Sequence, residues 1–122
     1  MTSKKKIPCR GDVYLVNFDP TLGSEIKKTR PAVIIQNDLG NRFNSITIVA
    51  PITSAKRKAY RVYVQITAPE GGLKKDSTVL LDQIRATDKQ RLNKCLGHLS
   101  DETMARIDKA LMISLGLEQY IL

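Results

Sequence analysis

Residues 11–36 read GDVYLVNFDPTLGSEIKKTRPAVIIQ, two apolar segments joined by a long polar loop. Segment 12–18 is apolar on both faces of an extended chain, and 31–36 is a nearly continuous apolar run. Strands of this kind belong in a closed or covered sheet. The connection 19–29 contains Pro20 and Gly23, which favour turns. The sequence therefore predicts two strands buried on both sides, with a polar loop between them.

Short apolar segments separated by turn residues continue to residue 99, and one helix follows. We predict a polar turn at 37–44, a short helical turn at 89–93 after Asp88, and strands at 45–52, 62–66, 77–81 (extended on through 84–86) and 95–99. Ser100 is a typical N-cap, and Gly116 a typical end, for a helix with an apolar stripe of Met104, Ile107, Leu111 and Leu115. The stripe faces the core or, alternatively, a dimer partner. The fold class is mostly β (α+β), a small curved antiparallel sheet with a C-terminal helix.

The length and the charge set the class of protein. A chain of 122 residues supports one domain. The excess of 20 Lys and Arg over 12 Asp and Glu, a net charge of +8, suggests nucleic acid, an acidic protein tail or a membrane surface as partner, or only solubilising charge. No apolar run is long enough for a membrane span, and no apolar segment of a signal peptide follows the basic start. We expect a flexible basic arm at 1–10, a single domain at 11–122 and a cytoplasmic location.

Most cofactor and hydrolase classes lack their motifs in this chain. Cys9 and Cys95 have no metal-ligand spacing, so we interpret them as reduced thiols. His98 stands among apolar residues and is expected to be a buried structural histidine. There is no phosphate-binding P-loop, no dinucleotide-binding glycine motif and no nucleophile elbow. No metal site and no cofactor are therefore expected.

Arg30 stands where the polar loop becomes a strand, so the scaffold fixes its position. A guanidinium donates two parallel hydrogen bonds to phosphate oxygens. RNA carries its own nucleophile, the 2′-OH, so an enzyme that cleaves RNA without a metal must align that hydroxyl, stabilise charge on the phosphate and move protons. The alternative for Arg30 is a surface salt bridge with Glu25 or Asp38.

A set of motifs resembles the MazF/PemK/Kid family of toxin endoribonucleases over nearly all of residues 10–117. In chain order they are GDVY (11–14), DPT (19–21), GSE (23–25), TRP (29–31), QND (36–38), GNRF (40–43), PIT (51–53), DQIR (82–85) and DKQRL (88–92). The resemblance implies a small SH3-like antiparallel β-barrel of the PemK/CcdB type with a C-terminal α-helix. It also implies a homodimer whose RNA groove involves the dimer interface.

The resemblance implies a sequence-specific, metal-independent endoribonuclease acting on single-stranded RNA, with 2′,3′-cyclic phosphate and 5′-OH ends. The family's catalytic arginine and threonine fall on Arg30 and Thr53. Some relatives use a histidine in the first loop for proton transfer, which this chain lacks, so Glu25 is the local candidate for the general base. Thr53 could instead be a strand-end residue without a role, and Glu25 could only position Arg30.

The family's groove suggests which residues bind RNA. These are Asn17, Phe18, Ser24, Gln83 and Arg85, together with Lys56 and Arg57 of the loop 53–61. The basic run 56–58 could also contact an antitoxin or be a solvated face. The expected partner is a small MazE-like antitoxin with an acidic, disordered tail, and the expected cleavage site contains ACA with possible flanking U. Two alternatives remain open, a CcdB-type gyrase poison that cuts nothing and a non-catalytic RNA-binding relative.

Overall fold

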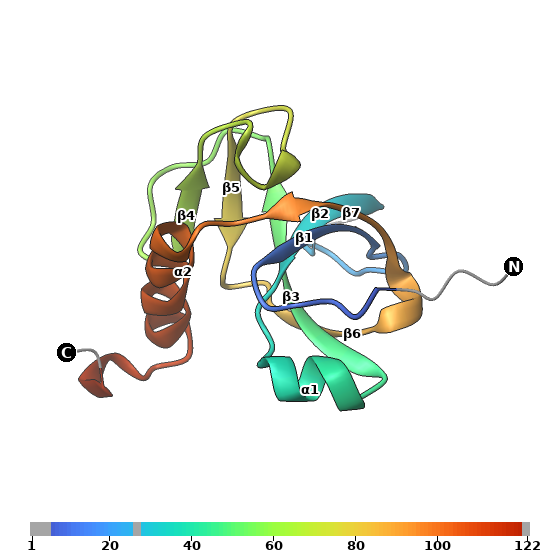
Figure 1. Ribbon diagram of the computed structural model, residues 1–122. Helices are drawn as coiled ribbons and strands as arrows, with labels where there is room; N and C mark the ends of the chain where they lie inside the picture. The colour runs from blue at the N-terminus through green and yellow to red at the C-terminus, as the bar shows by residue number, and fades with distance from the viewer. Residues whose placement is uncertain (1–5, 26–27, 121–122) are drawn as a thin grey trace, which may run out of the picture.

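The computed structural model describes residues 6–25 and 28–120 (Figure 1). Within them the strands are β1 (Asp12–Asn17), β2 (Thr29–Ile34), β3 (Ile46–Thr53), β4 (Tyr63–Ile66), β5 (Ser77–Leu80), β6 (Arg85–Asp88) and β7 (Leu92–His98). The helices are α1 (Asp38–Phe43) and α2 (Asp101–Ser114), with three short 3₁₀ turns, η1 (Glu70–Gly72), η2 (Lys89–Arg91) and η3 (Glu118–Tyr120). Among these residues, no helix is long and apolar enough to cross a membrane.

The sheet is antiparallel and is organised around β3, its longest strand. One edge of β3 pairs with β2, and the other edge is shared by β6 along its first half and β5 at its end. The strand order is β4-β5-β3-β2-β1-β7, with β6 attached to β3 beside this path. A mostly antiparallel sheet followed by a helix confirms the predicted fold class.

The sheet of the described residues is curved, but its strand ladder does not close, which corrects the β-barrel that the resemblance implied. The curved part runs β6-β3-β2-β1-β7, so β6 and β7 stand at its two ends. These two strands are consecutive in the chain, and η2 joins them. The covalent connection therefore closes the curve where a strand ladder is absent.

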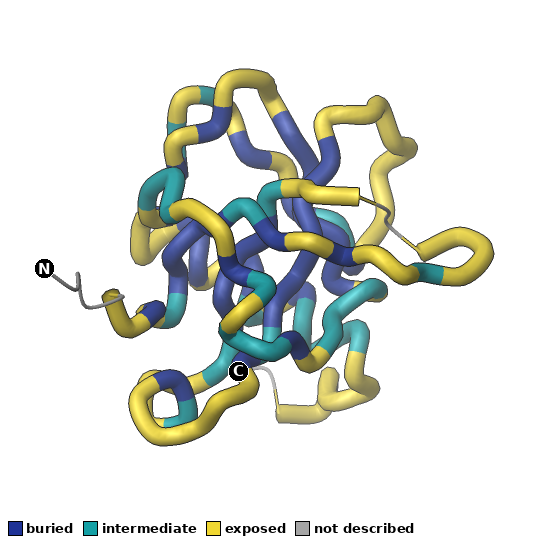
Figure 2. The backbone as a smooth tube through the Cα atoms, turned by 90° about the vertical axis from the view of Figure 1, so that its right-hand side faces the viewer, coloured by how far each residue is buried: buried dark blue, intermediate teal, exposed yellow. Residues whose placement is uncertain are grey.

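Both faces of the central strands are buried, as the sequence predicted (Figure 2). On β1, Val13 belongs to a large cluster beneath α2, whereas Tyr14 and Val16 belong to a smaller cluster inside the curve of the sheet. On β2, Val33 belongs to the large cluster beneath α2 and Ile34 to the smaller one. Successive side chains of a strand point to opposite faces, so each of these strands serves two cores.

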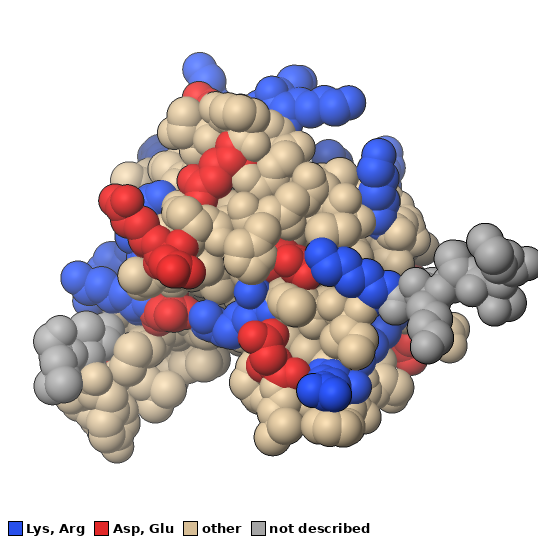
Figure 3. All heavy atoms as spheres, in the orientation of Figure 1, with Lys and Arg blue, Asp and Glu red and all other residues tan. Residues whose placement is uncertain are grey.

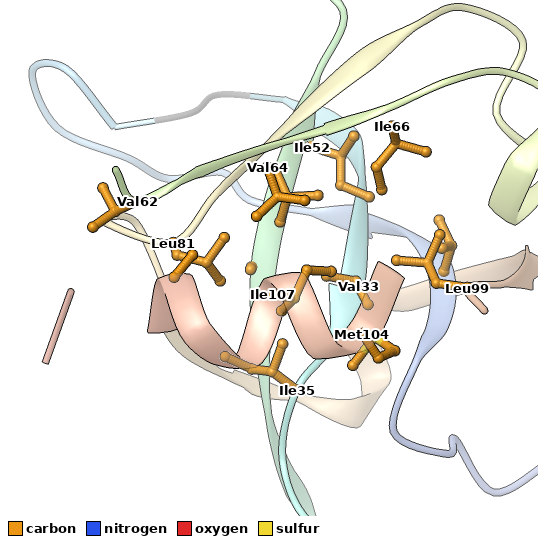
Figure 4. Packing of buried hydrophobic residues seen from close by; sticks show 14 of the residues in the cluster. Val33, Ile35, Ile52, Val62, Val64, Ile66, Leu81, Leu99, Met104 and Ile107 are labelled. Atoms are coloured by element: carbon orange, nitrogen blue, oxygen red, sulfur yellow. The ribbon is translucent and has the colours of Figure 1, made fainter. Parts of the chain in front are cut away.

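Helix α2 covers the outer face of the sheet (Figure 4). Its N-cap is Ser100, whose Oγ accepts a hydrogen bond of 3.1 Å from the backbone N of Thr103. Met104 and Ile107 are buried between the helix and the strands, close to Val33 in Figure 4. The predicted apolar stripe is therefore confirmed as core-facing up to Leu111. The prediction that Leu115 faces the core is wrong, because this residue is 53% exposed just after the helix ends.

Two local predictions are wrong. Residues 37–44 are not a turn but contain α1, because the Asn37 side chain caps it at the N of Gly40, and the buried Asn41 accepts a hydrogen bond of 2.7 Å from the Thr47 hydroxyl. His98 is not buried, since its side chain is 54% exposed on β7. Its Nδ1 lies 2.8 Å from Oδ1 of the buried Asp12.

The start of the chain is tied to both helices. The Arg10 backbone N donates to Asp38 Oδ1 at 2.7 Å, its Nε donates to the Ile35 carbonyl at 2.9 Å, and its guanidinium pairs with Asp108 of α2. The last part of the predicted arm is therefore fixed to the domain. Residues 1–5 of that arm lie outside the described residues. Cys9 and Cys95 are free thiols.

Candidate active site

A cleft of about 400 Å³ opens at one end of the curved sheet. Three segments form it: the β1–β2 loop, the end of β3 and the connection from β5 to β6. Five residues that the sequence predicted for the site line this cleft, namely Phe18, Ser24, Glu25, Gln83 and Arg85. Residues more than 50 positions apart in the sequence thus meet in one place.

The strand register relates Arg30 to Thr53. Strands β2 and β3 pair from Ile34 opposite Val49 to Ala32 opposite Pro51, and Arg30 and Thr53 each lie two residues beyond this last pair, Arg30 on β2 and Thr53 on β3. Residues directly opposite in an antiparallel pair project from the same face. Pro51 lines the cleft and shares its face of β3 with Thr53. The two residues predicted to be catalytic do not line the cleft themselves, but each lies two residues from the last β2–β3 pair, whose Pro51 does line it.

The Thr53 hydroxyl is oriented by the chain that follows it. Its Oγ1 accepts a hydrogen bond of 3.2 Å from the backbone N of Ala55, and the residue is 8% exposed. A hydroxyl that accepts one hydrogen bond still has its own hydrogen to donate. Thr53 can therefore act as a fixed donor toward a phosphate oxygen.

Arg85 and Phe18 are engaged with each other at the wall of the cleft. The guanidinium carbon of Arg85 lies 5.6 Å from the centroid of the Phe18 ring, and Nη1 donates to the Phe18 carbonyl at 3.3 Å. Phe18 is only 1% exposed. A base that stacks on this ring must first displace the arginine, whereas Arg85 itself, half-buried, presents its edge to the cleft.

A second arginine holds the base of the β1–β2 loop. Arg91 Nη1 donates to the carbonyls of Asn17 at 3.1 Å and Asp19 at 2.6 Å. The two sides of the loop are joined by a hydrogen bond of 2.9 Å from the Lys28 backbone N to Asp19 Oδ1. With Arg85, three consecutive carbonyls of the loop base are bound by arginines. Arg91 belongs to the motif DKQRL (88–92), but the sequence indicated no role for it.

Two carboxylates line the cleft, one of them unforeseen. Glu25 is exposed, and its Oε1 accepts a hydrogen bond from the backbone N of Leu22, within the loop. Asp82, on the opposite wall, accepts a hydrogen bond of 3.4 Å from the Tyr63 hydroxyl. The sequence placed Asp82 in a motif before Gln83 without assigning it to the site. Either carboxylate is of the chemical type that accepts a proton.

The remaining predicted residues lie around the cleft rather than in its lining. Asn17 ends β1, and its Oδ1 accepts a hydrogen bond of 3.1 Å from the Asp19 backbone N. Lys56 and Arg57 are exposed on the connection between β3 and β4.

Within the described part of the chain, no group of three or more His, Cys, Asp or Glu is placed to hold a metal ion. Burial raises the pKa of Tyr14, inside the curve of the sheet, to about 12, so its hydroxyl stays protonated at neutral pH.

Comparison with known proteins assigns the family. Residues 9–115 match the model of the PemK-like, MazF-like toxins of type II toxin–antitoxin systems. The chain therefore belongs to this family, and it is a MazF-type endoribonuclease toxin.

Among its relatives, Endoribonuclease EndoA of Bacillus subtilis (strain 168) is 50% identical over 109 residues, which cover 88% of this chain and 94% of that protein. MazF from Deinococcus radiodurans has a similar structure, with a TM-score of 0.80 and 26% identity over 92% of this chain and 99% of that one. A mycobacterial endoribonuclease, solved in complex with its cognate antitoxin, gives a TM-score of 0.76 and 26% identity over 90% of this chain and 96% of that one.

Proposed function

We propose that this toxin cleaves single-stranded RNA at specific sequences, without a metal ion, and that Arg30 and Thr53 act on the scissile phosphate. The observation that supports the proposal is the pairing of β2 with β3, because Arg30 and Thr53 lie just beyond its last pair, Ala32 and Pro51, and Pro51 lines the cleft. Both residues belong to strands, which fixes their backbone before RNA binds. Prepositioned donors can each contribute about 3 kcal/mol to transition-state stabilisation.

The reaction needs only groups present in the RNA and in this site. The 2′-oxygen attacks the adjacent phosphorus, the bond from phosphorus to the 5′-oxygen breaks, and the products carry a 2′,3′-cyclic phosphate and a 5′-OH. Arg30 binds the non-bridging oxygens, where charge accumulates, and Thr53 adds a donor. With a usual pKa of about 12 or more, Arg30 stabilises charge rather than donating a proton.

Proton transfer is assigned to the carboxylates of the cleft. Glu25 accepts the proton of the 2′-OH, and this proton passes from the protonated carboxyl, directly or through water, to the 5′-oxygen as it leaves, so that Glu25 is ionised again. Glu25 lies on the β1–β2 loop, shortly before Arg30 in the sequence, and lines the cleft. Asp82 on the facing wall is the second candidate, because it lines the same cleft.

Sequence recognition is assigned to the polar residues around the cleft. Asn17, Ser24, Gln83 and Arg85 offer donors and acceptors for base edges, and Phe18 offers a ring behind Arg85. Single-stranded bases are read by such edge contacts and by stacking, whereas phosphate contacts supply affinity. Lys56 and Arg57, on their exposed loop, are assigned to phosphates or to the antitoxin.

The proposed partners are an antitoxin and a second copy of the chain. The relatives from Deinococcus radiodurans and mycobacteria were solved with MazE or a cognate antitoxin. A net charge of +8 suits an acidic, disordered antitoxin tail that becomes ordered on binding. Leu115, Leu117 and Tyr120 are exposed after α2, which supports association of two copies. Such a toxin acts in the cytoplasm, where its RNA substrates are.

The test is cleavage of a long natural RNA in EDTA by the wild type and by Arg30→Ala. We expect the variant to lose cleavage while its circular dichroism and melting temperature stay unchanged, because Arg30 is exposed. Primer extension gives the cleavage sequence, and analysis of the 3′ ends identifies the cyclic phosphate. A variant that cuts at the normal rate would overturn the mechanism. A wild type that leaves RNA intact would favour a gyrase poison, and binding without cleavage would favour a non-catalytic relative.

A further inference from the structure

A second groove, of about 440 Å³, adjoins Arg30. Its floor is apolar and includes Leu15, Leu73 and Leu96. Its rim carries four cations, Arg30, Lys74, Lys75 and Lys94, and no Asp or Glu is among the described residues that line it. We call it the lysine groove. It is a separate cavity from the cleft, and it brings together basic residues to which the motifs gave no role.

Close contact between backbones fixes the shape of the lysine groove. Gly71 and Gly72 have positive φ values of 66° and 74°. A Cβ on Gly72 would lie 2.0 Å from the Leu96 carbonyl oxygen, and one on Gly97 would lie 2.7 Å from the Gly71 carbonyl carbon. Only glycine permits this approach of η1 to β7.

The contact of Gly71 and Gly72 with β7 positions Lys74 and Lys75, which follow in the chain. Leu73, directly after the glycines, is 5% exposed and belongs to the core beneath α2. The segment with Lys74 and Lys75 is thereby held against β7, which carries Lys94. In Figure 3, basic side chains gather along the upper right of this face, in the region of the turn before β5, whereas acidic ones lie mainly toward the side of α2.

We propose that the lysine groove binds the sugar–phosphate backbone of the RNA segment that continues past the scissile phosphate, outside the cleft. This inference depends on the proposed function. Arg30, which we propose binds the scissile phosphate, also lines the groove. An RNA strand whose scissile phosphate lies on Arg30 therefore leaves the cleft directly onto the groove, where three further cations follow.

The chemistry of the groove fits a backbone contact rather than base reading. No aromatic side chain is among its described lining residues, so it lacks the stacking platform that unpaired bases use. Ammonium groups bind phosphates without regard to sequence. We therefore expect the groove to raise affinity for long substrates and to leave the cleavage sequence unchanged.

The test compares two triple variants with equal loss of charge. In the first, Lys74, Lys75 and Lys94 are changed to Ala. In the matched control, Arg42, Arg61 and Lys109 are changed to Ala, because these residues are also exposed but line neither the groove nor the cleft. Circular dichroism and melting temperature verify that both fold. The substrates are oligonucleotides around a mapped cleavage site, with both flanks long or with either the 5′ or the 3′ flank cut short.

For the long substrate, we expect the groove variant to raise KM about tenfold with kcat unchanged, and to reduce the slope of log KM against log salt by about 2, as for three lost phosphate contacts. One of the two truncations should remove this difference from the wild type, which identifies the flank. The control variant should retain the wild-type dependence on flank length. The same penalty on all substrates, or the same length effect in the control, would overturn the proposal.

A binding measurement separates failure of the groove from failure of the enzyme. Long and short RNAs with a 2′-deoxy nucleotide at the cleavage site bind without being cut, and fluorescence anisotropy reports their Kd. If wild-type protein binds but never cuts RNA, the proposed function fails while the length effect on Kd still tests the groove. If the groove variant binds both RNAs normally but no longer binds polyglutamate, the groove is a site for an acidic peptide and the RNA proposal is wrong.

Discussion

The cleft and the face under α2 are held together in different ways. The face under α2 is close-packed from apolar side chains of five strands and a helix, with Val33, Ile52 and Ile107 at most 1% exposed. At the cleft, the β1–β2 loop is exposed, and its base is bound by hydrogen bonds from Arg85 and Arg91 to backbone carbonyls. Packing fixes the scaffold, and a few polar contacts fix the site.

This difference separates stability from activity. Removing a packed side chain should lower the free energy of unfolding and leave the chemistry of the folded molecules unchanged. Removing a polar group at the cleft should impair the chemistry and leave the free energy of unfolding almost unchanged. Its contacts lie at the surface, where a hydrogen bond contributes little to folding. The predictions below test this separation, from the largest expected effect to the smallest.

Ile107→Ala tests the packed face. Ile107 is 0% exposed between α2 and the sheet. We expect the free energy of unfolding, measured by urea titration, to fall by about 3 to 4 kcal/mol, from lost burial and the cavity left behind. Cleavage per folded molecule should stay close to that of the wild type at a temperature where both are folded. A large loss of kcat in the folded variant would show that the two regions are coupled.

Arg30→Lys tests whether geometry or charge matters at the phosphate. Lysine keeps the positive charge but lacks the planar fork that donates two parallel hydrogen bonds. We expect kcat to fall about 100-fold, equivalent to about 2.7 kcal/mol, because a donor is lost where charge develops in the transition state. KM should change little, and unfolding by urea should be unchanged. Near-normal kcat would mean that the charge alone suffices and that the planar fork of Arg30 contributes nothing to transition-state stabilisation.

The sequence predicted the packed face well, because burial leaves a periodic pattern. Apolar residues on both sides of segment 12–18 predicted a doubly covered strand, and the stripe from Met104 to Leu111 predicted the side of α2 that is buried. The error at Leu115 arises at the end of the helix, where the chain turns away. Periodicity records which face is buried only as long as the element continues.

The polar contacts at the site could be predicted only in part. The motifs predicted which residues gather at the cleft, and Glu25, Gln83 and Arg85 do line it. They did not predict that Arg91 binds the loop base, since one guanidinium reaching two carbonyls more than 70 residues away leaves no local pattern. His98 was misjudged for a similar reason, because apolar neighbours hid its place on an exposed strand opposite Asp12.

Arg91→Ala tests the clamp on the loop. Without hydrogen bonds to the Asn17 and Asp19 carbonyls, the loop that carries Ser24 and Glu25 should sample more conformations. We expect kcat/KM to fall about tenfold, roughly 1.4 kcal/mol, and amide exchange to rise in residues 18–28 but not in α2. Arg91→Lys should recover part of the loss, since one donor remains. Arg42→Ala, an exposed change of equal charge on α1, should have no such effect, and equal losses in both variants would refute a positioning role.

Glu70→Gln tests the smallest contact that connects the η1 turn to α2. Partial burial alone would raise the pKa of Glu70, but hydrogen bonds from Ser100 and Thr103 outweigh it and lower the pKa below its usual value of 4.5. Because the native carboxylate binds protons less readily than the unfolded one, its contribution to stability is complete above that value and disappears as the pH falls through the lower native pKa. Glu70 is half-buried, so solvent limits this contribution to less than about 1 kcal/mol. Urea unfolding should therefore show wild type more stable than Glu70→Gln at neutral pH, with the difference closing as the pH falls below 4.5 and through the lowered pKa of Glu70. The absence of any difference at neutral pH would mean that the amide and the carboxylate hold Ser100 equally well, and a difference that does not change with pH would mean that it does not come from the charge of Glu70.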